Sequence, residues 1–152
     1  MVENQLKQHI NADMKIMLRN NDKIRLGIIR MLMAAIKQRE VDERITLDDM
    51  QIIAVINKMI KQRQEACAQF KAGNRQDLVD KENFEIEFLK SYVPQALEDN
   101  ELEQLILFAI NEINAKSMHD MGKIMEIVKN KAQGRADMAK VSTKVKALLM
   151  AK

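Results

Sequence analysis

Apolar residues recur every three or four positions along nearly the whole chain, and few residues interrupt that pattern. Only four glycines and one proline occur among the 152 residues, whereas Lys, Glu, Gln, Ala, Leu, Ile and Met dominate. The dominant residues lose little side-chain freedom in a helix, while Gly and Pro are the main helix breakers. The sequence therefore predicts an all-α protein.

Four helices are expected before the single proline, Pro94. The predicted segments are residues 6–20, 23–39, 46–72 and 75–90. Thr46 and Asp49 indicate a capping box at the start of the third segment, and Gly73 indicates its end. Proline lacks a backbone N–H and cannot continue a helix. We therefore predict an N-terminal helical domain of about four helices over residues 1–95.

Residues 96–152 are predicted to form a small C-terminal domain of three helices. The expected helices cover residues 101–115, 117–131 and 137–152. Ser117 and Asp120 are typical of a helix start, as is Asp137 before the last helix. Gly134 marks the break between the last two helices.

Charge is distributed unevenly along this second part. Residues 94–115 contain five acids and no Lys or Arg, whereas residues 116–152 contain nine bases and three acids and so carry +6, against +3 for the whole chain. Clustered cations favour polyanions because binding releases counterions. This pattern predicts tRNA or another structured RNA as a partner, and a solvated lysine face is the alternative.

The loop between the last two helices is the predicted phosphate-binding element. Lys131, the Gly134 backbone and Arg135 could reach a phosphate, because glycine permits close approach and arginine offers a forked donor. Alternatively, Gly134 ends one helix and Asp137 caps the next, which occupies the helix N-terminus that a phosphate would use. The predicted RNA-binding residues are Lys123, Lys131, Gly134, Arg135, Lys140 and Lys144.

Catalytic and cofactor sites are not indicated. His9 and His119 lie far apart in the sequence, and neither belongs to a metal-binding motif. Cys67 has no base beside it, and the scattered glycines form no phosphate-binding loop. Aromatic residues make up only 3% of the chain, too few for an aromatic sheet face that reads single-stranded bases. We expect no metal, no cofactor and no self-sufficient enzyme.

The compartment is predicted from the cysteine and from apolar runs. A lone Cys67 cannot form an intrachain disulfide, which favours a reducing compartment. Residues 1–7 lack the pattern of a signal peptide, and no run approaches 18 uncharged apolar residues. These features predict a cytoplasmic protein that does not span a membrane.

Arginines recur in the two central helices, among them Arg30. Its guanidinium, next to apolar residues that we expect to be buried, would need a carboxylate partner. The candidate partners are Glu65, Glu85 and Glu87. This pattern predicts a structural ion pair.

Five segments, taken in order, resemble the YqeY family of small bacterial proteins. They are residues 61–63, 70–79, 92–97, 120–125 and 134–137. The resemblance implies a helical domain followed by a smaller domain similar to the tail of the B subunit of glutamine-dependent tRNA amidotransferase, a tail that engages tRNA. That tail has Lys where this chain has Glu126, and Asn-Pro where it has Asp137-Met138. Both changes add negative charge.

Three functions follow from these patterns. The leading hypothesis is a non-catalytic helical module that binds tRNA or other structured RNA through its basic C-terminal domain. One alternative is a module that binds a protein partner, which an exposed apolar groove on the four-helix part would favour. The other is an accessory to glutamine-dependent amide transfer on aminoacyl-tRNA, a carbon–nitrogen ligase reaction that this chain would not catalyse alone.

Overall fold

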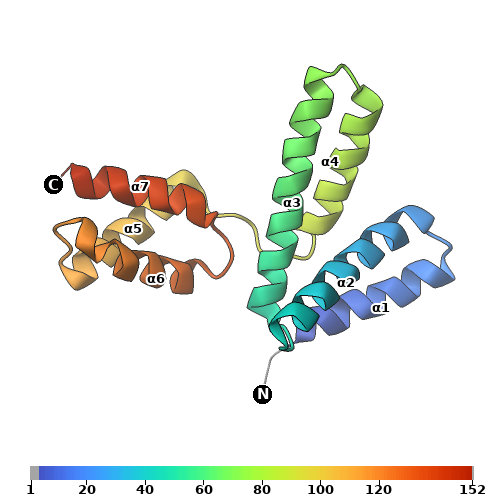
Figure 1. Ribbon diagram of the computed structural model, residues 1–152, viewed down its shortest axis with the longest axis horizontal. Helices are drawn as coiled ribbons and strands as arrows, with labels where there is room; N and C mark the ends of the chain where they lie inside the picture. The colour runs from blue at the N-terminus through green and yellow to red at the C-terminus, as the bar shows by residue number, and fades with distance from the viewer. Residues whose placement is uncertain (1–3, 152) are drawn as a thin grey trace. The chain divides into compact units, whose positions relative to one another are not determined.

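The computed structural model describes residues 4–151, and most of these residues are helical (Figure 1). Those residues form seven α-helices and one short 3₁₀ helix and contain no strand, which confirms the predicted all-α class. The chain divides into a first compact unit that ends at Val93 and a second that begins at Pro94. The expectation about a signal peptide rests partly on residues 1–3, which lie outside the described residues.

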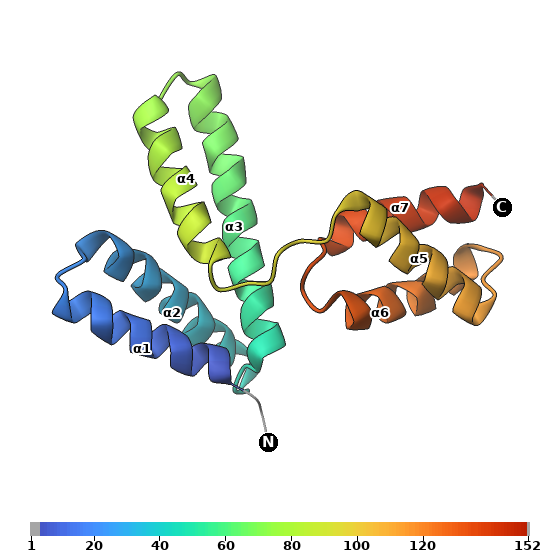
Figure 2. The same cartoon turned by 180° about the vertical axis from the view of Figure 1, so that it is seen from behind.

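The first unit consists of two helical hairpins. Its helices are α1 (Gln5–Arg19), α2 (Lys23–Glu43), α3 (Asp49–Ala72) and α4 (Gln76–Lys90). Figures 1 and 2 show α1 beside α2 and α3 beside α4, and both α1 and α2 also pack on α3. The core contains fully buried aliphatic residues from all four helices, among them Ile10, Ile29, Leu32, Ile56 and Leu89. Burial of one such side chain stabilises the fold by about 1.5–3 kcal/mol.

The capping box of α3 lies two residues after the predicted position. Asp48 is the N-cap: its Oδ1 accepts a hydrogen bond from the backbone N–H of Gln51 at 2.8 Å, and Gln51 Oε1 accepts one from the N–H of Asp48 at 2.9 Å. Thr46 is exposed outside the helix, so the predicted Thr46–Asp49 box is wrong. The intervening Leu47 is fully buried, which fixes where the helix begins. Gly73 is the C-cap residue, as predicted.

This corrected cap makes a direct prediction. We expect Asp48→Ala to lower the free energy of unfolding by about 1 kcal/mol, because it removes the acceptor for an N–H at the start of the helix. Thr46→Ala, the matched control, should have little effect because Thr46 makes no capping bond. Urea unfolding of both variants measures the difference in the free energy of unfolding. A larger loss in Thr46→Ala than in Asp48→Ala would support the box predicted at Thr46 and Asp49.

Glu40 of α2 connects three parts of the first unit. Its carboxylate accepts hydrogen bonds from Lys7 Nζ at 2.9 Å and from the backbone N–H of Leu47 at 2.9 Å. The hydrogen bond from Lys7, and after it the one from Leu47, holds the pKa of Glu40 below its ordinary value of 4.5. The ionised carboxylate therefore stabilises the contact between α1, the end of α2 and the start of α3.

The depressed pKa of Glu40 predicts a pH dependence of stability. A carboxyl group with a lower pKa in the folded state stabilises the protein above its unfolded pKa, and that contribution is lost as pH falls through the folded pKa. We expect the free energy of unfolding to fall more steeply below about pH 4.5 in the wild type than in Glu40→Gln. Chemical unfolding at a series of pH values tests this, and parallel curves would contradict it.

The second unit is a three-helix arrangement. It contains α5 (Asp99–Ile113), the 3₁₀ helix η1 (Met118–Asp120), α6 (Met121–Ala132) and α7 (Met138–Met150). The three α-helices pack on one another in all three pairings. Their shared core is aliphatic and includes Ile106, Ile110, Ile124, Val128, Val141 and Val145.

The caps of this unit agree only partly with the sequence. Ser117 accepts a hydrogen bond from the N–H of His119 and so caps η1 rather than α6. Gln133, with φ of 48°, is the C-cap of α6, and Gly134 follows with φ of 80°, so the predicted glycine cap is displaced by one residue. Asp137 is the N-cap of α7, as predicted.

Candidate functional site

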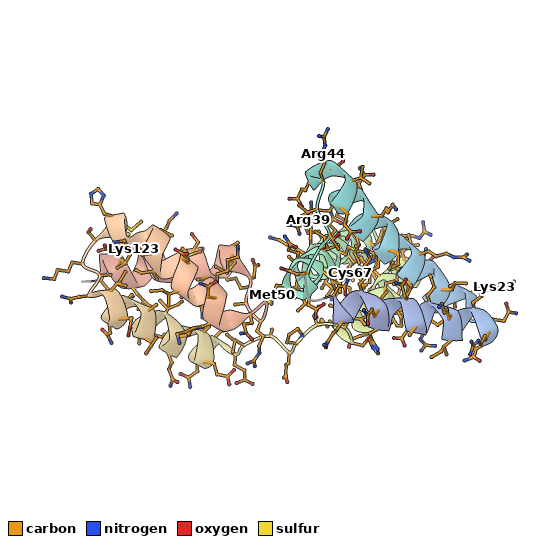
Figure 3. The ribbon with its side chains drawn as sticks, turned by 90° about the horizontal axis from the view of Figure 1, so that it is seen from below. Lys23, Arg39, Arg44, Met50, Cys67 and Lys123 are labelled. Atoms are coloured by element: carbon orange, nitrogen blue, oxygen red, sulfur yellow. The ribbon has the colours of Figure 1, made fainter. Side chains whose placement is uncertain are left out.

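The six predicted RNA-binding residues lie on α6, on α7 and in the loop between them. Lys123 and Lys131 belong to α6, and Lys140 and Lys144 to α7. Lys123, labelled in Figure 3, is exposed, as are Lys131 and Lys140. The other three residues, Gly134, Arg135 and Lys144, are half-buried.

Lys131 lies against an aromatic ring of α5. Its Nζ is 4.8 Å from the centroid of the Phe108 ring, and that residue is 47% exposed. A lysine cation over an exposed ring gains about 0.5–1 kcal/mol. The Lys131 ammonium therefore has a weak contact that a stronger anionic partner could replace.

Arg135 connects the loop between α6 and α7 to the segment that precedes α5 through two hydrogen bonds. Its Nε donates to the carbonyl oxygen of Gln95 at 2.8 Å, and its own carbonyl accepts from the N–H of Leu97 at 2.7 Å. Asp137 Oδ1 accepts from the N–H of Ala139 at 3.0 Å and so occupies the N-terminus of α7. The alternative interpretation of Asp137 as a cap is thus correct, and a phosphate contact through the terminal nitrogens of Arg135 stays a prediction.

Lys144 also contacts α5. Its Nζ is 3.3 Å from Asp99 Oδ1, and the Asp99 side chain is 89% exposed. An ion pair this exposed contributes little stability. In the described residues no ion pair or ring contact joins one of the predicted lysines or Arg135 to another, and the side-chain contacts of these residues are with α5 and the segment before it.

Two further lysines lie on the sides of α6 and α7 that turn away from these α5 contacts. Residues two positions apart on a helix project about 160° apart. Lys129 therefore lies nearly opposite Lys131 on α6, and Lys146 nearly opposite Lys144 on α7, and both are exposed. Sequence reasoning did not select Lys129, which follows buried Val128 on α6 and is exposed.

Most lysines of the second unit are exposed and lack an acidic partner. Within residues 94–151 the ion pair of Lys144 with Asp99 is the only one formed by a lysine. Five exposed lysines form neither an ion pair nor a ring contact with a described residue: Lys116, Lys123, Lys129, Lys140 and Lys146. These five residues are called the lysine surface below.

The first unit contains a surface pocket between α2 and α4. It has a volume of about 230 Å³ and is lined by Arg25, Phe84, Glu87 and Phe88. The Arg25 guanidinium lies 5.3 Å from the centroid of the Phe84 ring. Met31 and Ile24 of α2 are 54% and 69% exposed. We call this pocket the α2–α4 groove.

A buried ion pair joins α3 and α4. Arg63 of α3 is 8% exposed, and its Nε donates to Glu85 Oε2 of α4 at 2.8 Å. Its Nη2 lies 3.7 Å from Met31 Sδ of α2. Glu85 was a predicted partner, but for the wrong arginine: Arg30 is exposed, because it projects about 160° from buried Leu32. Arg63, in contrast, shares the buried face of α3.

Two other side chains of the first unit, Tyr92 and Cys67, have polar contacts of their own. The Tyr92 hydroxyl donates to Asp13 Oδ2 at 2.6 Å, and burial, followed by this hydrogen bond, raises the pKa of Tyr92. The tyrosine therefore stays protonated and acts as a donor. Cys67, labelled in Figure 3, is half-buried, with its Sγ 3.5 Å from Asn83 Oδ1.

In residues 4–151 no group of three His, Cys, Asp or Glu side chains could hold a metal ion. None of the helices in these residues has the length and apolar character needed to cross a membrane.

Comparison with known proteins gives one family and several relatives. The family described as "Yqey-like protein" matches residues 7–149. "Altered inheritance of mitochondria protein 41, mitochondrial" of Pyrenophora tritici-repentis is 27% identical over 155 residues, which cover 99% of this chain and 84% of that protein. The protein of that name in Lachancea thermotolerans is 34% identical over 88 residues, 57% of this chain and 47% of the relative.

A third relative comes from Saccharomyces cerevisiae strain YJM789 and has the same name. It is 27% identical over 122 residues, which cover 78% of this chain and 66% of that protein. All three relatives are named as mitochondrial proteins of eukaryotes. The expectation of a purely bacterial group was therefore too narrow.

Proposed function

The chain belongs to the family of YqeY-like proteins, and from this premise we propose that it is a helical module that binds tRNA or other structured RNA through its second unit. The observation that carries this proposal is the lysine surface, five exposed cations on and next to α6 and α7 without an acidic partner in the described residues. Such cations release counterions when they meet phosphates. The resemblance of residues 120–137 to a tail that engages tRNA supports the same function.

Two features limit where the RNA lies. Glu126 is exposed on α6 between Lys123 and Lys129, and its negative charge repels a phosphate there. The acidic helix α5 carries no Lys or Arg. The phosphate backbone therefore follows the lysines of α6 and α7 rather than α5.

Binding of bulk tRNA across a salt series tests this function. With five phosphate contacts, the logarithm of the association constant should fall with the logarithm of salt concentration with a slope of about −3.5 to −4.5. Polyglutamate, which is anionic but lacks nucleotides, should bind more weakly at every salt concentration. If the purified chain fails to retain tRNA even at about 50 mM salt, the RNA proposal is wrong.

We place this function in the cytoplasm. The lone, half-buried Cys67 fits a reducing compartment that contains tRNA. The mitochondrial location in the relatives' names belongs to those proteins. Fractionation of the cells that make this chain tests the compartment, and recovery in another fraction would contradict this part of the proposal.

The α2–α4 groove favours a second candidate function, docking of an amphipathic helix from another protein. Its charged side chains already have partners within the chain: Arg25 pairs with Asp22, and Glu87 with Lys90. The lining also offers an occupant two aromatic side chains, Phe84, which is 41% exposed, and Phe88. Such a surface selects apolar side chains at helical spacing rather than a polyanion.

Site-specific photocrosslinking tests this second function. A photoreactive analogue at Arg25, which lines the groove, should capture a segment with an apolar stripe, whereas the same analogue at Met150, 80% exposed in the second unit, should not. A synthetic peptide of the captured segment should bind the wild type and lose binding to Phe84→Asp. Equal capture from both positions, or peptide binding unaffected by Phe84→Asp, would rule out the groove.

A further inference from the structure

Phe108 is the one aromatic residue in the sequence of the second unit, and it is not part of the core. It lies two positions after fully buried Ile106, which places it about 160° from Ile106 around α5. The residue is 47% exposed, and neighbouring Leu107 is 40% exposed. An aromatic ring with an accessible face can stack on a nucleobase of any identity.

The charges around this ring are arranged asymmetrically. On the α6 side, Lys131 Nζ lies 4.8 Å from the ring centroid. On α5 itself, Glu101 and Glu112 are exposed, and helical spacing places both within about 40° of Phe108. A nucleotide over the ring would therefore direct its phosphate toward Lys131 and away from the two glutamates.

We propose that Phe108 and Lys131 form a stacking platform for an unpaired nucleobase of the bound RNA. The base stacks on the Phe108 ring, and the Lys131 ammonium leaves the ring for the adjacent phosphate. The exchange is favourable because a cation on an exposed ring contributes about 2- to 5-fold in affinity, whereas base stacking contributes about 5- to 150-fold. This inference rests on the proposed RNA-binding function and adds that the RNA presents an unpaired nucleotide.

The test compares two synthetic RNA hairpins with the same stem, one with a single-stranded 3′ overhang and one with a blunt end. Fluorescence anisotropy measures binding of both to the full chain and to Phe108→Leu, Phe108→Trp and Lys131→Gln. We expect Phe108→Leu to bind the overhang RNA about 10-fold more weakly and the blunt RNA as the wild type does. Phe108→Trp should retain the preference for the overhang.

The salt dependence of RNA binding distinguishes the contribution of base stacking from that of charge. Phe108→Leu removes no charge, so its salt slope should match that of the wild type, whereas Lys131→Gln should give a slope shallower by about 0.7. The platform is overturned if the wild type binds both RNAs equally, or if Phe108→Leu weakens both equally. If the wild type binds neither RNA, the proposed function fails and the platform with it.

Discussion

Glu85→Ala is expected to lower the free energy of unfolding of the first unit by about 3–5 kcal/mol, because it breaks a buried ion pair by removing one partner. The change leaves the Arg63 guanidinium, 8% exposed, without its carboxylate. The remaining contacts of Arg63 are a 3.5 Å hydrogen bond to the Met59 carbonyl and a 3.7 Å contact with Met31 Sδ. Neither compensates a buried positive charge.

A matched control exists on the same hairpin. Arg75 and Asp77 form an ion pair of 3.0 Å, but their side chains are 59% and 65% exposed. Asp77→Ala should therefore change stability far less than Glu85→Ala, because water solvates the arginine that remains. The double variant Arg63→Met/Glu85→Leu should recover most of the lost stability, since it removes both charges. Unfolding in guanidinium chloride measures the stability of all three variants. Equal losses of stability in Glu85→Ala and Asp77→Ala would show that burial of the Arg63–Glu85 pair makes no difference, which would contradict this prediction.

Removal of the lysine surface is expected to have the largest effect on RNA binding. Replacing Lys123, Lys129, Lys140 and Lys146 with Gln removes four exposed cations that have no ion-pair partner in the described residues. The salt slope for tRNA should become shallower by about 3–4, and affinity should fall more than about 10-fold at low salt. Because the four side chains are exposed, the fold should be retained, which circular dichroism checks.

The control for this variant carries the same change in net charge on the first unit. Lys15, Lys58, Lys61 and Lys71 are all exposed there and form no ion pair with a described residue. Replacing these four with Gln should leave the salt slope near that of the wild type. If both sets weaken tRNA binding equally, the interaction depends on overall charge, and the second unit is not its site.

The helices could be predicted because their signals are local. Apolar spacing and the breakers Gly73 and Pro94 depend only on neighbouring residues, and the helices lie close to the predicted segments. The capping residues were harder to predict, because the start of α3 depends on burial of Leu47 in the tertiary core. Between Thr46 and Asp48, two adequate capping residues, only packing decides.

The candidate site depended more heavily on tertiary contacts. The sequence showed that residues 116–152 are basic, but not that Arg135 binds the Gln95 carbonyl or that Lys131 covers Phe108. Nor could it pair Arg63 with Glu85, since the partner lies 22 positions away on another helix. Charge content is a property of composition, whereas the availability of each cation is set by its neighbours in space.

The most direct test of the account follows backbone amide resonances of the ¹⁵N-labelled chain while tRNA is added at low salt. The account predicts that chemical-shift changes and line broadening concentrate in the second unit, at the lysine surface and around Phe108. Changes confined to the first unit, or spectra that remain unaltered by tRNA, would contradict it.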